Sequence, residues 1–197
     1  MTSTSHQPRQ RVPAAERRDA LIAAAIEEFA VGGLHGTPVD RIARRVGVAQ
    51  PYVFSLFPTK RDLFIAAVDR GFEMVMDVFT EAAAQFKEEH SDGTYERDDL
   101  LGALGDSYIA LLAGNRAKLM FQLQAYAACA DDTIRERVSA AYQRLGVRVS
   151  ELTGADENEL NEFFSHGMWL NVQAALQTMD LEVACDWIRE LRERRAG

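Results

Sequence analysis

Cysteine and long hydrophobic runs are scarce in this 197-residue chain. The two cysteines, Cys129 and Cys185, belong to no CxxC or Cys/His cluster, so we expect reduced thiols rather than a disulfide. No apolar run approaches the roughly 20 residues of a membrane-spanning helix, and no apolar signal segment follows the polar N-terminus. The sequence therefore predicts a soluble, cytoplasmic protein without a metal or cofactor.

Catalytic motifs are also absent. The chain contains no GxSxG, HExxH or P-loop sequence, so we expect no enzymatic activity. Adjacent acid pairs, such as Glu27 with Glu28 and Asp98 with Asp99, point in different directions on a helix. We interpret these pairs as solvated surface.

Negative charge predominates, but it is unevenly distributed. The chain has a net charge of −8, whereas residues 1–60 hold eight Lys or Arg against five acids and are therefore basic. Residues 61–197 hold fourteen Lys or Arg against twenty-five acids. This asymmetry fits a basic head that meets phosphate and an acidic body that stays away from it.

Residues 37–60, TPVDRIARRVGVAQPYVFSLFPTK, contain two short helical patterns separated by one glycine. The first pattern runs from Thr37, its expected N-cap, to Val46. Gly47 then provides the residue that can adopt positive φ in a tight turn. Apolar positions recur at spacings of three and four, which predicts a buried face formed by Val39, Ile42, Ala43 and Val46.

The second pattern runs from Gln50 to Phe57 and ends before Pro58, with Val53 and Leu56 facing inward. Helix, glycine turn and second helix is the arrangement of a DNA-binding helix-turn-helix, whose second helix enters the major groove. An ordinary helical hairpin is the alternative interpretation. The side chains left on the outer face are Gln50, Tyr52 and Ser55.

The segment IARRVGV and the segment FSLFPTKRDLF resemble the DNA-binding domain of the TetR family of bacterial transcriptional repressors. The motif covers about a quarter of the chain. Two departures concern Ala49, where the family usually has a capping Ser or Thr, and Phe54, where it usually has a phosphate-contacting Tyr. The resemblance implies DNA contacts from Thr37, Arg44, Arg45, Gln50, Tyr52, Phe54, Ser55 and Lys60.

We expect an all-α fold: a three-helix head with the helix-turn-helix and a larger helical bundle for ligand binding and dimerisation, about nine helices in total. The first helix should end at Gly32 and Gly33, and Thr59 should cap a long helix shared by head and body. The predicted domains are a disordered arm (1–12), a DNA-binding domain (13–60) and an effector-binding and dimerisation domain (61–197). The remaining predicted helices are Arg97–Ala113, Arg116–Ala128, Thr133–Leu152, Asp156–Thr178 and Leu181–Arg195.

Bulky adaptable side chains are numerous in the body. Met and aromatic residues at helical spacing are usually core, but a gap among them would form an apolar ligand pocket. Gln122 and His166 add polar groups that could orient a ligand. The candidate effector-binding residues are Phe72, Met76, Phe79, Tyr108, Phe121, Tyr126, Met168 and Asn171.

Small residues recur along the penultimate predicted helix, which would let another helix approach closely. We expect the last two helices to pair with their copies across a two-fold axis, since a palindromic DNA site requires two recognition helices. The alternative is a stripe buried within the monomer. The candidate dimer residues are Gly167, Ala174, Ala175, Thr178, Trp187 and Leu191.

The function that the resemblance implies is a homodimeric repressor of a palindromic operator in double-stranded DNA. A small, largely apolar effector would release it through the long shared helix. The alternative is a DNA-binding regulator without a small-molecule effector.

Overall fold

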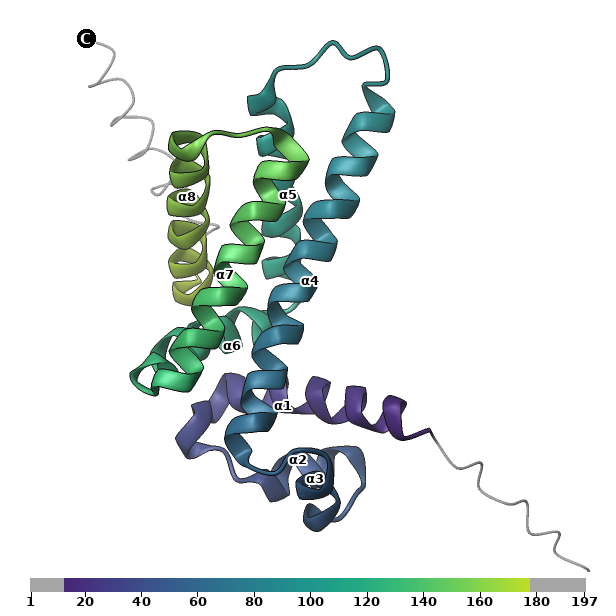
Figure 1. The fold of residues 1–197 in the computed structure, drawn as a ribbon, viewed down its shortest axis with the longest axis vertical. Helices are drawn as coiled ribbons and strands as arrows, with labels where there is room; N and C mark the ends of the chain where they lie inside the picture. The colour runs from purple at the N-terminus through teal and green to yellow at the C-terminus, as the bar shows by residue number, and fades with distance from the viewer. Residues whose placement is uncertain (1–12, 178–197) are drawn as a thin grey trace, which may run out of the picture.

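Helices account for all the regular structure between residues 13 and 177, the part of the chain that the computed structural model describes (Figure 1). Eight α-helices lie in this part, which confirms the all-α prediction. The predicted arm (1–12) and the predicted helix at 181–195, with Cys185, lie outside the described residues. The elements are α1 (Ala14–Gly36), α2 (Val39–Val46), α3 (Gln50–Leu56), α4 (Lys60–Glu89), α5 (Arg97–Gly114), α6 (Arg116–Ala127), the 3₁₀ turn η1 (Ala128–Ala130), α7 (Asp132–Thr153) and α8 (Glu157–Leu176).

The helix-turn-helix consists of α2 and α3. Gly47 follows α2 with φ 72° and ψ 32°, and its N–H donates to the carbonyls of Ala43 and Arg44. This left-handed conformation is accessible to glycine without a Cβ penalty, so the predicted turn is confirmed. Ile42 and Ala43 are fully buried, as their spacing predicted.

α1 changes direction at Gly33, whose φ of 61° and ψ of −173° lie outside the helical region. This agrees with the predicted helix end at Gly32 and Gly33. A Cβ on Gly33 would lie 2.6 Å from Oε1 of Gln124 on α6. Glycine at this position therefore allows both the bend and the close approach of the two helices.

We expect Gly33→Ala to lower the free energy of unfolding by about 1–2 kcal/mol, because alanine is strained at positive φ. Gly36→Ala is the matched control, since a Cβ there meets nothing within 4 Å and Gly36 has no positive φ. Urea unfolding followed by circular dichroism measures both. Equal stability of the two variants would contradict the expectation.

Thr37 does not cap α2, so that prediction is wrong. Pro38 occupies the N-cap position, and no side-chain hydrogen bond caps this helix. The Thr37 side chain is 1% exposed, and its hydroxyl donates to the Glu28 carbonyl at 3.1 Å. Packing against Gly32, where a Cβ would lie 2.6 Å from Thr37 Oγ1, turns the hydroxyl toward α1.

The long helix α4 connects the head to the body (Figure 1). Thr59 caps it as predicted: its hydroxyl accepts the N–H of Asp62, while its own N–H donates to the Asp62 carboxylate. Such a capping box fixes where the helix begins. The first turn of α4 therefore has a defined position directly beside α3.

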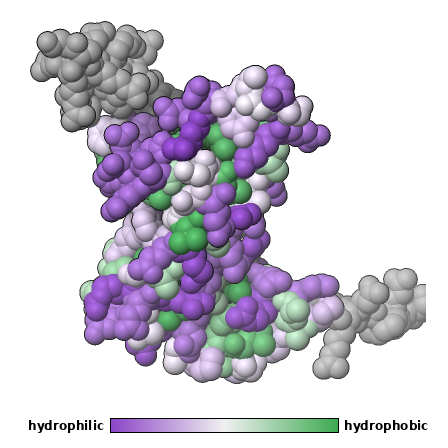
Figure 2. Space-filling model, turned by 45° about the horizontal axis from the view of Figure 1, so that its top comes forward, coloured by the Kyte–Doolittle hydropathy of each residue, from purple (hydrophilic) through white to green (hydrophobic). Residues whose placement is uncertain are grey.

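In the body, α4, α5, α7 and α8 run roughly along the long axis of the molecule, and α6 lies across their lower end beside α1 (Figure 1). Hydrophilic residues cover most of the face drawn in Figure 2, with hydrophobic residues in small patches between them. Among residues 13–177, no helix combines the length and hydropathy needed to span a lipid bilayer.

Within the single chain, the small-residue stripe of α8 packs against other helices of the body, and its part in a dimer interface stays a prediction. Gly167 lines an internal cavity, and Ala174 and Ala175 are half-buried against the core. Arg116 on α6 donates to the carbonyls of both alanines, at 3.2 and 3.1 Å. The other predicted interface residues, Thr178, Trp187 and Leu191, lie outside the described part of the chain.

Candidate functional site

The outer face of α3 presents polar side chains to solvent. Gln50 and Ser55 are exposed, whereas Val53 is 1% exposed and anchors the helix in the head. Tyr52 is half-buried, with the Arg17 guanidinium 5.9 Å from its ring centroid. Phe54 is exposed, and nothing among the described residues covers its ring enough to bury it. The recognition surface expected from the sequence is therefore accessible.

Glu28 on α1 is buried and organises the arginines of α2. Arg41 and Arg45 each place a guanidinium nitrogen 2.9 Å from one of its carboxylate oxygens. Glu27 lies farther from Arg45, at 3.8 Å. The prediction that both acids are solvated surface is wrong for Glu28, which is only 8% exposed. Because a buried carboxylate requires paired charge, Glu28 ties α2 to α1.

We expect Glu28→Gln to lower the free energy of unfolding by about 1–3 kcal/mol, less than for a fully buried pair because both arginines are half-exposed. Glu27→Gln is the matched control, and its cost should stay below about 0.5 kcal/mol. Urea titration of the two variants measures the difference. The expectation fails if the adjacent substitutions cost the same.

Two other cations are predicted to contact the DNA backbone, and they differ in the partners that their side chains already have. Arg44 is exposed and pairs only with Asp40, one helical turn earlier, among the described residues. The Lys60 ammonium donates to the carbonyls of His35 and Thr37, both at 3.2 Å, and so holds the loop before α2. Both cations lie at the surface of the head, where a phosphate could share or replace these partners.

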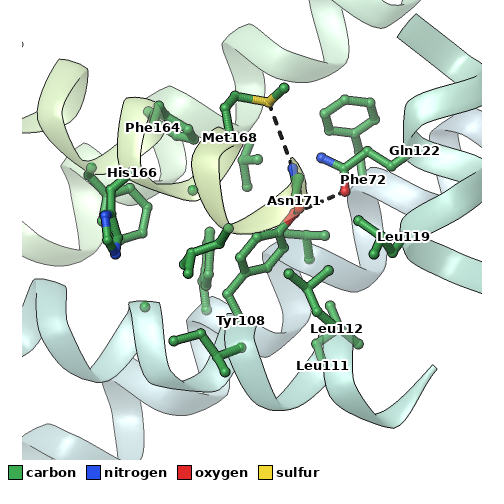
Figure 3. Close-up of a pocket in the computed structure, with 18 of the residues that line it drawn as sticks. Phe72, Tyr108, Leu111, Leu112, Leu119, Gln122, Phe164, His166, Met168 and Asn171 are labelled. Atoms are coloured by element: carbon green, nitrogen blue, oxygen red, sulfur yellow. Dashed lines mark hydrogen bonds between the residues drawn. The ribbon is translucent and has the colours of Figure 1, made fainter. Parts of the chain in front are cut away.

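A cavity of about 420 Å³ occupies the middle of the body (Figure 3). Residues from α4, α5, α6, α7 and α8 line it, together with Ile26 of α1. Its wall is mainly aliphatic and aromatic, the usual character of a small-molecule site. Of the predicted effector-binding residues, the wall includes Phe72, Phe79, Tyr108, Phe121, Tyr126, Met168 and Asn171.

Met76 is the exception, and its assignment to the pocket is wrong. It lies in a shallow groove between α4 and α7, with Ala140 and Val147 among its neighbours there. Phe72 and Phe79 are four residues before and three after Met76 on α4. Because α4 contacts α5 and α7 on different sides, the spacing alone did not distinguish the two faces.

Four polar side chains form a connected set inside the cavity. The Tyr108 hydroxyl lies 2.7 Å from Oδ1 of Asn171 and 3.0 Å from the Gln122 side-chain oxygen, and Gln122 Nε2 donates to the Tyr126 hydroxyl at 2.9 Å. A hydroxyl has one hydrogen, so Tyr108 can donate to only one of its two acceptors at a time. The side chains of Tyr108, Gln122 and Asn171 converge in Figure 3. This set connects α5, α6 and α8.

These hydroxyls remain protonated at neutral pH. Burial raises the pKa of Tyr108 above its ordinary value of 10.0, and burial likewise raises the pKa of Tyr126. Among residues 13–177, the Asn171 side-chain nitrogen has only the Met168 sulfur, at 3.7 Å, as an acceptor. Since sulfur is a weak acceptor, the cavity retains neutral hydrogen-bonding capacity for a ligand.

Phe121 on α6 links the cavity to the head. It lines the cavity, and its ring lies 5.4 Å from that of Phe64 on α4 and 6.4 Å from that of Phe29 on α1. Phe29 and Phe64 contact each other edge to face at 4.9 Å. A ligand that displaced α6 would therefore also displace α1 and α4 through these ring contacts.

Comparisons with known proteins agree with this architecture. A sequence model described as "Bacterial regulatory proteins, tetR family" matches residues 21–67. The HTH-type transcriptional activator FasR of Mycolicibacterium smegmatis is 40% identical over 60 residues, which cover 30% of this chain and 27% of FasR. The sequence likeness to this relative is thus confined to about a quarter of its length.

The likeness to solved structures extends over most of the chain. A TetR-like transcriptional regulator from Rhodococcus sp. RHA1 superposes with a TM-score of 0.67 at 18% identity, covering 94% of this chain and 98% of that one. FadR from Bacillus subtilis, in complex with stearoyl-CoA, superposes with a TM-score of 0.64 at 16% identity, covering 82% and 87%. At these identities the superpositions establish a common fold.

Proposed function

Since this chain belongs to the TetR family, through the DNA-binding segment at residues 21–67, we propose that it is a homodimeric transcriptional repressor that leaves a palindromic operator when an apolar effector fills its cavity. The observation that carries the proposal is the position of α6. One side of this helix lines the cavity, and the other packs against α1 of the head. A ligand in the cavity can therefore change the orientation of the head through α6.

The DNA contacts follow from accessibility. Gln50, Tyr52 and Ser55 on the outer face of α3 read base edges in the major groove. Arg44 and Lys60 contact phosphates and set the orientation of the head, with Phe54 packing beside them. Thr37 is excluded from the interface because its side chain is buried, and Arg45 contributes only if it leaves its pairs with Glu27 and Glu28.

For the dimer, we propose a contact through the side of α8 opposite the cavity. Trp169, Val172 and Leu176 are exposed there, and they recur at spacings of three and four. Leu176 is 67% exposed, an unusual position for leucine on an otherwise hydrophilic surface. A two-fold pairing that serves a palindromic site must hold the two α3 helices about 34–36 Å apart, the separation of successive major grooves.

The effector is small and largely apolar, as the cavity wall requires. FadR, which has a similar fold, is in complex with stearoyl-CoA, and this supports an effector with a long apolar part. The effector favours a conformation in which α6 and α4 move the two heads away from the spacing of the operator. Because binding free energies are coupled reciprocally, operator DNA must then weaken effector binding by the same factor.

Fluorescence anisotropy with a palindromic duplex, selected by the protein from a random DNA library, tests the proposal. We expect tight binding at low salt and a loss of about 10³-fold or more between 50 and 200 mM salt, from six or more phosphate contacts. Affinity indifferent to salt would refute DNA binding. If DNA binds but no apolar compound that raises the melting temperature also lowers operator affinity, the protein is a regulator without an effector.

A further inference from the structure

The cavity opens to solvent along one side, between α5 and α8. Every exposed residue of the cavity lining belongs to one of these two helices. Three glycines also line this side, and a Cβ on any of them would meet nothing within 4 Å. We call the opening the α5–α8 slot. Its exposed residues are Asp98, Gly102, Asp106, Glu162 and His166, and its glycines are Gly102, Gly105 and Gly167.

Two cross-links between α5 and α8 mark the ends of the slot. At one end, Arg97 donates to both carboxylate oxygens of Glu159, at 2.7 and 2.8 Å. At the other end, the Tyr108 hydroxyl lies 2.7 Å from Asn171 Oδ1. Tyr108 lies eleven positions after Arg97 on the same helix, so the slot is about 16 Å long. An extended apolar chain could pass through such an opening.

Carboxylates outnumber cations among the described residues at the slot. Asp98, Asp106 and Glu162 take part in no ion pair with any residue of the described ranges, and Glu159 is already paired with Arg97. The cations among the lining residues are Lys118, which is half-buried, and His166 when protonated. A ligand head group that remains in the slot while its apolar part enters the cavity therefore meets an excess of carboxylates.

We propose that the α5–α8 slot is the entrance of the effector and that it selects an apolar molecule with a positively charged head group over one with a negatively charged group. This inference rests on the effector response described above. The cavity itself is the binding site, and the unpaired carboxylates decide which charge is accepted. At an effective dielectric constant between those of protein and water, each carboxylate changes affinity about two- to threefold, and three together change it roughly tenfold.

Three probes with the same ten-carbon chain separate charge from hydrophobicity: decylammonium, decanol and decanoate. Isothermal titration calorimetry on the full-length protein at pH 7 measures their affinities. We expect decylammonium to bind most tightly, decanol next and decanoate least, with at least about tenfold between the two ions. Equal affinities, tighter binding of decanoate, or no binding of any probe would overturn the proposal.

Isosteric substitutions locate the origin of the preference. In the triple variant Asp98→Asn, Asp106→Asn and Glu162→Gln, we expect the ratio of decylammonium to decanoate affinity to fall by at least about tenfold. The control Glu81→Gln, Glu88→Gln and Glu136→Gln changes net charge equally at exposed positions outside the cavity lining, and it should keep the ratio. A preference that survives the first triple variant, or disappears in the second, would overturn the assignment to the slot.

A steric variant tests the entrance without changing charge. Gly105→Leu places a side chain in the open space of the slot, and we expect it to weaken decylammonium binding at least about tenfold without destabilising the helix, because leucine is a better helix former than glycine. Ala110→Leu, at an exposed position of α5 outside the lining, is the control. Unchanged binding in Gly105→Leu would exclude the slot as the entrance.

Operator affinity measured in the same samples separates this inference from the proposed function. If decylammonium shows the charge preference and operator affinity does not change, the slot assignment holds and the proposed effector response fails. If operator affinity falls with decanoate rather than decylammonium, the response holds and the slot assignment is overturned.

Discussion

Replacing Phe64 with alanine is expected to lower the free energy of unfolding by about 3–5 kcal/mol, the range for truncating a buried phenylalanine. Phe64 is fully buried, and its ring contacts those of Phe29 and Phe121. Alanine would leave a cavity where α1, α4 and α6 meet, which relaxation can fill only in part. Urea unfolding monitored by circular dichroism measures the loss.

Val147→Ala is the control for this substitution. Val147 is 59% exposed on α7, so its truncation should change stability by less than about 0.5 kcal/mol. If Phe64→Ala cost no more than Val147→Ala, the aromatic cluster would have no role in joining head and body.

The double substitution Gln50→Ala and Ser55→Ala is expected to weaken operator binding by about 10²- to 10⁴-fold, because each lost base contact costs about 1–3 kcal/mol. Binding to unrelated DNA should change little, since phosphate contacts supply it. Anisotropy titrations with the selected palindrome and with a scrambled duplex measure the two affinities.

Gln143→Ala with Ser139→Ala provides the same two residue types at exposed positions of α7, far along the chain from the head. This control should bind the palindrome like the unaltered protein. Equal weakening on both duplexes in the Gln50 and Ser55 variant would mean that these side chains contact the DNA backbone rather than the bases.

Local backbone rules account for the parts of the fold that the sequence predicted. Gly47 stands between two short apolar patterns, and few other residues can adopt the conformation of that turn. Thr59 with Asp62 forms a capping box that is recognisable from residue type and spacing alone. In both cases the deciding interactions lie within a few residues of one another, so no knowledge of the tertiary structure was required.

Residues that depend on distant partners were not predictable in this way. Glu28 has the appearance of a surface acid until α2 brings Arg41 and Arg45 beside it. Thr37 stands where the N-cap residue of α2 is expected, but its hydroxyl donates to the carbonyl of Glu28, nine residues earlier. Met76 follows the helical spacing of its cavity-lining neighbours and still faces α7.

The sequence predicted which residue types line the candidate ligand site, but it did not predict the shape of the site. Aromatic and methionine residues at helical spacing indicated an apolar interior, and most of them line the cavity. The opening was missed, although Gly102 and Gly105 are three apart on one helix and so share a face. The glycine pair is visible in the sequence, but the opening can be recognised only once the structure shows that α8 lies beside these glycines.

The cluster of Phe29, Phe64 and Phe121 also has a consequence for protein engineering. A chimaera that joins this head to a foreign regulatory body at residue 60 would separate Phe29 from both Phe64 and Phe121. Recombination points that transfer α6 together with residues 13–68 would keep all three rings in one parental piece. Modular exchange in this scaffold should therefore follow the aromatic contacts and not the apparent boundary in the linear sequence.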